Sequence, residues 1–169
     1  MNEASDALRI APAPITGDAA RSLITTLNAE LSAEYHEPGA NHFRLDPDEV
    51  APGAGVFLVA ELAGRAVGCA ALRRLRTPEL VRQLGPDVAE VKRMFVASDL
   101  RGQGVGRALL ERLEAEARAL GVTRLVLETG TRQTRALALY RSSGFTDIPP
   151  YGEYSASAAT SVCLAKAIG

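Results

Sequence analysis

The sequence has little of what metal centres and disulfide frameworks require. Cysteine occurs at two positions, Cys69 and Cys163, and histidine at two, His36 and His42. No cysteine cluster has the spacing of a zinc site, so no structural metal is expected. Both cysteines lie in apolar runs, which favours buried, reduced thiols of a cytoplasmic protein over a disulfide or a catalytic pair.

Long apolar runs and an excess of one charge are absent as well. No stretch of about 18 apolar residues occurs, which excludes an ordinary membrane-spanning helix. The N-terminal residues include Glu3 and Asp6 and have no apolar core, so no signal peptide is expected. The 19 basic and 20 acidic residues leave a formal net charge of -1, which gives no reason to expect nucleic acid or an anionic membrane as a partner. The default expectation is a cytoplasmic protein.

What is present suits a folded domain. Apolar residues make up 47% of the 169 positions and charged residues 23%, proportions typical of a globular chain that buries a substantial core. The sequence shows no internal repeat and no low-complexity linker. We therefore expect one α+β domain over residues 1–169.

Apolar periodicity and turn signals divide the chain into strands and helices. Leu23, Leu27 and Leu31 recur every four residues, which is typical of one face of a helix. Two apolar runs flank a short segment with Gly64, which indicates a hairpin. Residues 36–55, with three prolines and three glycines, predict a loop with one short helical turn. The predicted strands are 8–11, 56–60, 66–72, 91–96, 125–127 and 161–165, and the predicted helices are 16–35, 77–84, 103–120 and 135–142.

A glycine-rich turn at residues 101–107, Arg-Gly-Gln-Gly-Val-Gly-Arg, joins a predicted strand to an amphipathic helix. The first N–H groups of a helix have no intrahelical partner and carry partial positive charge. Glycines let a diphosphate approach this backbone closely, and Arg101 and Arg107 add charge-assisted donors. The pattern predicts a diphosphate cradle, and its alternative is a turn that merely starts a helix.

Two other phosphate-binding motifs do not fit this turn. A Walker A loop ends in Gly-Lys-Ser/Thr, which is absent here. A dinucleotide fingerprint with glycines at positions 102 and 104 requires a third glycine at position 107, where the chain has Arg107. Both motifs are therefore excluded.

The turn resembles the Gln/Arg-x-x-Gly-x-Gly/Ala signature of the GCN5-related N-acetyltransferases, the GNAT family. Arg101, Gly104 and Gly106 match its defining positions, after a strand and at the head of a helix. A second family block follows in the expected order, since residues 125–129 are similar to the fifth strand and residues 136–145 to the helix and Gly-Phe turn behind it. The resemblance is good over residues 56–148, and it implies the family's α+β fold, a mixed central sheet splayed between strands 4 and 5 with helices on both faces.

The resemblance implies acetyl-CoA as the co-substrate. In this family the pantetheine arm of CoA lies between two parted strands, which here are residues 91–96 and 125–129. The backbone of Met94, Phe95 and Val96 is then expected to pair with the pantetheine amides and to supply an N–H group for the thioester oxyanion. The residues expected to contact the rest of the cofactor are Arg101, Gly102, Gln103, Gly104, Val105, Gly106 and Arg107 at the diphosphate, and Gln133, which stands where many members have Asn.

The resemblance also implies catalytic residues. Tyr140 matches the family tyrosine that donates to the departing sulfur, and the alternative is a tyrosine that only packs. Glu90 lies where histone-acetylating members place a glutamate, so it is the first candidate for the base, with a solvated charge as the alternative. Glu128 is the reserve candidate, and His36 or His42 the third. No Ser-His or Cys-His nucleophile arrangement emerges, so direct transfer in a ternary complex is expected.

The acceptor side is defined more loosely. The resemblance assigns acceptor binding to residues 34–45 and 146–154, and the second segment either lines a pocket or forms a surface loop. The Glu-Thr-Gly and Tyr-Gly-Glu-Tyr stretches resemble a bacterial small-molecule branch of the family, which implies a small-molecule amine as the acceptor. The alternatives are a protein or peptide amine, and a non-catalytic module that binds acyl-CoA. A homodimer is an expectation by analogy only. The candidates for contact with an acceptor carboxylate, with solvent or the CoA 3′-phosphate as alternatives, are Arg73, Arg74, Arg76, Lys92 and Arg93.

Overall fold

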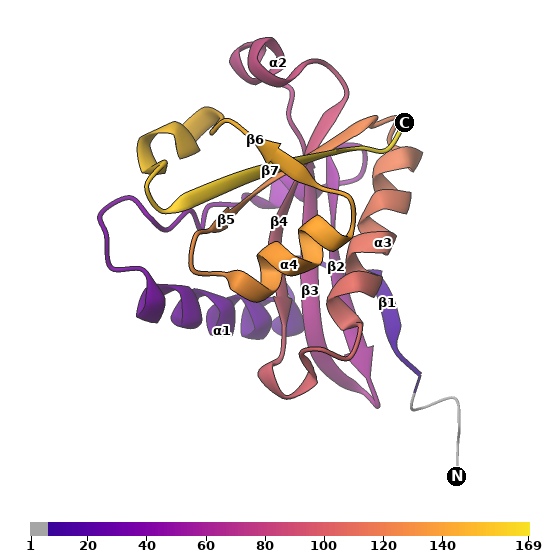
Figure 1. Cartoon of the computed structure of the whole chain (residues 1–169). Helices are drawn as coiled ribbons and strands as arrows, with labels where there is room; N and C mark the ends of the chain where they lie inside the picture. Colours follow the sequence, from indigo (N-terminus) through magenta and orange to yellow (C-terminus); the bar gives the residue numbers. More distant parts are fainter. Residues whose placement is uncertain (1–6) are drawn as a thin grey trace.

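A mixed sheet of seven strands lies at the centre of the protein, in a computed structural model that describes residues 7–169 (Figure 1). Its order is β1-β2-β3-β4-β5-β7-β6. The strands are β1 (Arg9–Pro12), β2 (Gly55–Leu62), β3 (Arg65–Arg74), β4 (Val88–Val96), β5 (Arg124–Gly130), β6 (Thr146–Ile148) and β7 (Ser161–Ala167). The helices are α1 (Asp18–Glu34), α2 (Pro78–Leu84), α3 (Val105–Ala119) and α4 (Thr134–Ser142), with short 3-10 turns η2 (Pro47–Val50), η3 (Ser98–Leu100) and η4 (Gly152–Ser157). Glu3 and Asp6, on which the expectation of no signal peptide depends, lie outside the described residues.

The parallel pair β4–β5 separates part of the way along its length. Val88 to Val91 pair with Arg124 to Leu127, and the pairing stops there although both strands continue. The other neighbouring strands in the sheet are antiparallel. The predicted splay between strands 4 and 5 is therefore confirmed, and it leaves the β5-facing edge of β4 without a strand partner beyond Val91.

A β-bulge accompanies this separation. The register between β3 and β4 shifts between Cys69 and Ala71, opposite Arg93 and Met94. Arg93 has a φ of 55°, which lies in the left-handed region that non-glycine residues seldom occupy. A bulge bends its strand and increases the local twist. The irregularity in β4 thus comes where the strand departs from β5.

Helices cover both faces of the sheet, as predicted. Alternate residues of β2 point to opposite sides, so Leu58 belongs to the cluster that includes α3, whereas Phe57 belongs to the cluster that includes α1. The apolar stripe predicted for α3 is buried, with Leu109 and Leu113 fully enclosed. Figure 1 shows α1 and α3 on different sides of the strands.

Most of the predicted elements are confirmed, with shifts at their ends. The hairpin of β2 and β3 turns at Ala63 and Gly64, whose φ angles of 50° and 76° suit a two-residue turn with positive φ. The fourth strand begins at Val88, three residues before the predicted start, because it also pairs with β5 there. Strand β6 was not predicted, since its three residues show no apolar alternation and exist as a strand only through pairing with β7.

The two cysteines are buried and free, as predicted. Burial raises the pKa of Cys69 to about 12 and that of Cys163 to about 11, so both thiols stay protonated at neutral pH. Within residues 7–169, no helix combines the length and the apolar character needed to cross a bilayer.

Candidate functional site

The glycine-rich turn opens into a groove. Gly104 caps α3 with a φ of 90°, and the first helical hydrogen bond runs from the Ala108 N–H to the Gly104 carbonyl at 3.0 Å. The amides of residues 105–107 therefore lack helical acceptors, as expected at a helix start. A groove of about 870 Å³ lies beside them, between the end of β4, this turn and α4. The turn is thus accessible, and its amides border a space large enough for a ligand.

Glycine is required in this turn for two reasons. The positive φ of Gly102 and Gly104, 80° and 90°, would strain residues with a β-carbon. At Gly106 a β-carbon would lie 3.1 Å from Leu139 Cδ2, so this glycine lets α3 approach α4 closely. Two of the glycines thus shape the turn, and the third brings the two helices together along the groove.

The two arginines of the turn have different surroundings. The Arg101 Nε–H donates to the Val96 carbonyl at 2.9 Å, and its Nη2 pairs with Glu30 at 2.7 Å. Arg101 thus ties the turn to β4 and α1, and one hydrogen-bonding position of the Val96 carbonyl is occupied. Arg107 is exposed and donates to Ser142 Oγ at 2.9 Å across the groove. Arg107 is therefore the freer of the two charges that border the groove.

A second, smaller cavity of about 120 Å³ lies where β4 and β5 part. It adjoins the groove, because Leu27, Met94, Gln133 and Ala136 line both. The residues that contribute most of its polar wall are Tyr35, Asn41, His42, Lys92, Arg93, Glu128, Gln133, Tyr140 and Tyr154. The parted strands therefore connect the turn-lined groove with a polar chamber on the α1 side of the sheet.

Tyr140 and Gln133 both reach these spaces from α4. Tyr140 is buried, packs edge-on against Phe145 and lines the chamber. Burial is the main cause that raises its pKa, with the nearby Glu128 adding to the effect. Gln133 caps α4 and donates from Nε2 to Glu34 at 2.6 Å. Tyr140 thus lines the chamber, and Gln133 lines both the chamber and the groove.

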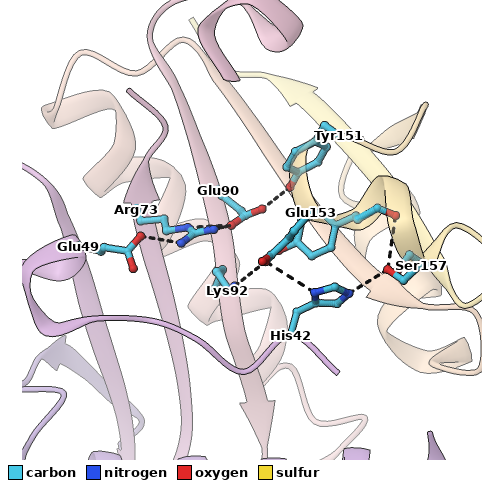
Figure 2. Close-up of polar contacts among 10 residues, drawn as sticks. His42, Glu49, Arg73, Glu90, Lys92, Tyr151, Glu153 and Ser157 are labelled. Atoms are coloured by element: carbon cyan, nitrogen blue, oxygen red, sulfur yellow. Dashed lines mark hydrogen bonds and ion pairs between the residues drawn. The ribbon is translucent and has the colours of Figure 1, made fainter. Parts of the chain in front are cut away.

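Glu90, the first candidate for the base, does not line the chamber. Its side chain is 1% exposed, and Arg73 Nε donates to one carboxylate oxygen at 2.8 Å. The other oxygen accepts from the Tyr151 hydroxyl at 2.5 Å, while Arg73 also pairs with Glu49 at 2.6 Å (Figure 2). Both oxygens are thus engaged, and the carboxylate links η2, β3 and the segment before η4. Glu90 thus joins these segments to the sheet.

Glu128, the reserve candidate, lies on β5 and lines the chamber. Burial raises its pKa to about 7, although the nearby Ser161 hydroxyl acts in the opposite direction. The Ser161 hydroxyl lies 2.9 Å from that of Ser157, which lies 2.9 Å from His42 Nε2. His42 Nδ1 is 3.7 Å from the half-exposed carboxylate of Glu153 (Figure 2). Two hydroxyls and an imidazole thus form a row that begins beside Glu128 and ends near the half-exposed Glu153.

The remaining candidates are dispersed. His36 is exposed and does not line the chamber, whereas His42 does, and burial lowers the pKa of His42. Arg74 donates to the Leu120 carbonyl and Arg76 to the Gly53 carbonyl, so both serve the fold. Of the five basic residues that were candidates for contact with an acceptor carboxylate, Lys92 and Arg93 line the chamber.

The covering segment after β6 was only partly predicted. Tyr151 and Tyr154 are buried, and Tyr154 lines the chamber, so this segment is a wall of the site rather than a surface loop. Ser157 and Ser161 were not predicted as site residues. Isolated serines in a polar stretch carry no local signal, and their roles come from the contacts that η4 and β7 make with His42 and Glu128.

Comparisons with known proteins agree with this architecture. Residues 21–145 match the model of the acetyltransferase (GNAT) family. An IAA acetyltransferase of Azospirillum brasilense is 42% identical over 137 residues, which cover 81% of this chain and 83% of that protein. The crystal structure of a candidate acyl-CoA N-acyltransferase from Klebsiella pneumoniae has a TM-score of 0.78 and 28% identity, covering 96% of this chain and 98% of that one. A GNAT family acetyltransferase from Elizabethkingia anophelis, solved with acetyl-CoA bound, shares the fold with a TM-score of 0.63, 18% identity and coverage of 95% and 97%.

The raised pKa of Glu128 predicts a pH-dependent cost to stability. Between pH 4.5 and about 7 the unfolded chain releases this proton while the folded protein retains it, so the free energy of unfolding falls as pH rises through this window. Glu128→Gln removes the effect. We expect the variant to gain on the order of 2–3 kcal/mol relative to the wild type from pH 4.5 to 7.5, measured by urea denaturation. Glu111→Gln, an exposed control on α3, should show the same pH dependence of the free energy of unfolding as the wild type. If Glu128→Gln also shows the wild-type pH dependence, the raised pKa of Glu128 is contradicted.

Proposed function

This chain belongs to the acetyltransferase (GNAT) family, and on that premise we propose that it transfers the acetyl group of acetyl-CoA to an amine of a small molecule in a ternary complex. The observation that carries the proposal is the opening between β4 and β5, which joins the groove at the glycine turn to the chamber lined by Tyr140 and Glu128. The two reactants can therefore enter from opposite ends of one opening. We propose that residues 1–169 act as a single domain.

The groove suits the coenzyme. The free amides at the start of α3 and the charge of Arg107 are placed to hold a diphosphate, since helix N-termini bind anions. Beyond Val91 the β5-facing edge of β4 offers backbone groups that a pantetheine arm pairs with in place of a strand. Phe95 pairs with Cys69 of β3, and neighbouring residues of a strand direct their backbone groups to opposite edges. Because the Val96 carbonyl already accepts from Arg101, we assign the pairing with pantetheine mainly to Met94 and to the Val96 N–H. Acetyl-CoA supplies the activated thioester carbonyl.

Tyr140 is proposed to give a proton to the departing sulfur. Tyr140 lies in a buried wall of the chamber, and its raised pKa keeps its hydroxyl protonated at neutral pH. The hydroxyl is therefore available to donate to the sulfur as negative charge develops there while the C–S bond breaks. General acid catalysis of this kind is worth about 10²- to 10⁴-fold in rate.

Glu128, rather than Glu90, is proposed as the base. An amine attacks only when it is neutral, so a proton must leave the nitrogen as the N–C bond forms and the C–S bond breaks. A carboxylate whose pKa is about 7 is matched to this task near neutral pH. The Ser161, Ser157 and His42 chain then offers the proton a path outward.

The acceptor is proposed to be a small molecule because the chamber is small, about 120 Å³. The loop with His42 and Phe43 and the segment with Tyr154 cover it, and the edge-on contact of His42 with Tyr154 at 4.8 Å joins the two. A protein substrate would have to separate these covers, which makes a peptide amine the second candidate. A non-catalytic acyl-CoA-binding module is the third, and it has no need of Tyr140.

Tyr140→Phe tests whether the chain is a catalyst. We expect kcat for thiol release from acetyl-CoA, measured with a panel of amines, to fall about 100-fold while the Kd for acetyl-CoA stays within twofold. Tyr151→Phe is the matched control, since it also removes a buried hydroxyl but one that faces Glu90 instead of the chamber. Unchanged turnover in Tyr140→Phe would remove this residue from the mechanism. Tight binding of acetyl-CoA by the wild type without turnover of any amine would favour a non-catalytic acyl-CoA-binding module.

The choice of base is tested by two matched variants. For the wild type, kcat/KM should rise with pH and level off above about 7, because Glu128 must lose its proton to act. Glu128→Gln should lower kcat/KM at least 100-fold and abolish the rise of kcat/KM with pH. Glu90→Gln should keep the rise of kcat/KM with pH. It should instead lower the free energy of unfolding by about 3 kcal/mol, because it breaks a buried ion pair. The reverse pattern would restore Glu90 as the base.

The diphosphate site is tested at Arg107. Arg107→Ala should raise the Kd of CoA about tenfold at low salt, and by less at 0.5 M salt, because a partly exposed charge is screened. Calorimetric titration with CoA measures both. Arg141→Ala, which removes an exposed arginine that does not line the groove, is the control. Equal losses in the two variants would show a general charge effect and not a contact.

A further inference from the structure

Lys92 is buried in the chamber without a hydrogen-bond partner. Its side chain is 5% exposed, and its Nζ is the single buried side-chain nitrogen or oxygen without a partner among residues 7–169. The nearest carboxylate oxygen, Glu153 Oε1, lies 3.9 Å away, beyond hydrogen-bonding distance (Figure 2). An ammonium has three donors to satisfy, and a buried one without partners is costly. The Lys92 ammonium thus lacks a hydrogen-bond acceptor, and the chain itself does not supply one.

The surrounding groups are already committed. Glu90 is held by Arg73 and Tyr151. Glu128 on β5 also lines the chamber, and burial raises its pKa to about 7. Glu153 on η4 is 51% exposed and lies 3.7 Å from His42. None of these carboxylates accepts a hydrogen bond from Lys92, so the three donors of Lys92 remain free.

The positive groups in the chamber also differ in what they offer. Arg93 donates to Asn28 of α1 and lies over the ring of Phe43, which is in the loop after α1, at 5.4 Å. Burial lowers the pKa of Lys92, although the nearby Glu90 and Glu153 act in the opposite direction. Burial also lowers the pKa of His42, so it stays neutral near pH 7. Lys92 is therefore the cation available to a ligand in the chamber.

We propose that Lys92 binds a carboxylate of the acceptor, so that the acceptor is a small amine that also carries a carboxylate, as an amino acid does. This inference rests on the proposed acetyl transfer and names its substrate class. Lys92 stands on β4 and Glu128 on β5, on either side of the opening. A molecule with both groups places its carboxylate at Lys92 and its amine toward Glu128 and the thioester. Leu31, Phe43 and Tyr154 leave an apolar wall for its side chain.

The test uses pairs of amines that differ by one carboxylate: phenylalanine and phenethylamine, leucine and isoamylamine, histidine and histamine. In the wild type the carboxylate member should have the higher kcat/KM. Lys92→Met should lower kcat/KM for that member about 10- to 100-fold, mainly through KM, and leave its partner unchanged. Lys92→Arg, which keeps the charge, should retain part of the preference. Arg21→Met removes an exposed positive charge on α1, outside the chamber and the groove, and should change neither.

Stability gives a readout that is independent of turnover. Because Lys92→Met removes a buried charge without a hydrogen-bond partner, we expect the ligand-free variant to melt about 2–4 °C higher than the wild type. A side chain that merely supports the fold would lower the melting temperature when replaced. The predicted combination is thus a more stable protein with a weaker acceptor site.

The outcomes separate this inference from the proposed function. Equal losses for both members of a pair in Lys92→Met, or a wild-type preference for the amines without a carboxylate, overturn the carboxylate site while acetyl transfer stands. If no amine is acetylated, acetyl transfer to this substrate class fails. Calorimetric titration of the CoA-bound protein with each carboxylate then decides the site: binding that Lys92→Met abolishes supports it, and no binding of any carboxylate overturns it.

Discussion

The separation of β4 from β5 after Val91 and Leu127 is the constraint on which the rest of the structure depends. Buried backbone N–H and C=O groups are nearly always paired, so two strands that part inside a sheet leave groups that need other partners. The chain itself pairs one of these backbone groups, since Arg101 donates to the Val96 carbonyl. The rest of the edge faces a groove, where an extended amide-bearing ligand can take the place of a strand.

The bulge at Arg93 and the glycine turn are consequences of the same opening. A regular β4 would continue alongside β5, whereas the bulged strand turns away and leaves room between Met94 and Gly130. The strand then runs into the turn before α3, so the free amides of the helix start border the space that the strands have vacated. One distortion of the sheet thus aligns a site for a long anionic thioester with a chamber for its acceptor.

Charge in the chamber is arranged by burial and by competition for partners. Arg73 and Tyr151 engage Glu90, which joins η2 and the covering segment to the sheet. That arrangement leaves Glu128 to titrate near neutrality and Lys92 without a hydrogen bond. Both features make the free protein less stable than a fully paired one. Groups of this kind are characteristic of functional sites, where stability is given up for binding and catalysis.

The sequence by itself determined what local pattern controls. The stripe of Leu109 and Leu113, the hairpin at Gly64, the glycine turn and the placement of Tyr140 follow from periodicity, backbone freedom and motif spacing within short segments. Only the tertiary structure decided which carboxylate faces the chamber, because Glu90 and Glu128 have similar local sequence surroundings and differ in the distant residues that meet them. Arg73 and Tyr151 come from other segments to engage Glu90, and no partner comes to Lys92. Burial and pairing of this kind depend on contacts between residues far apart in the chain, which no local pattern encodes.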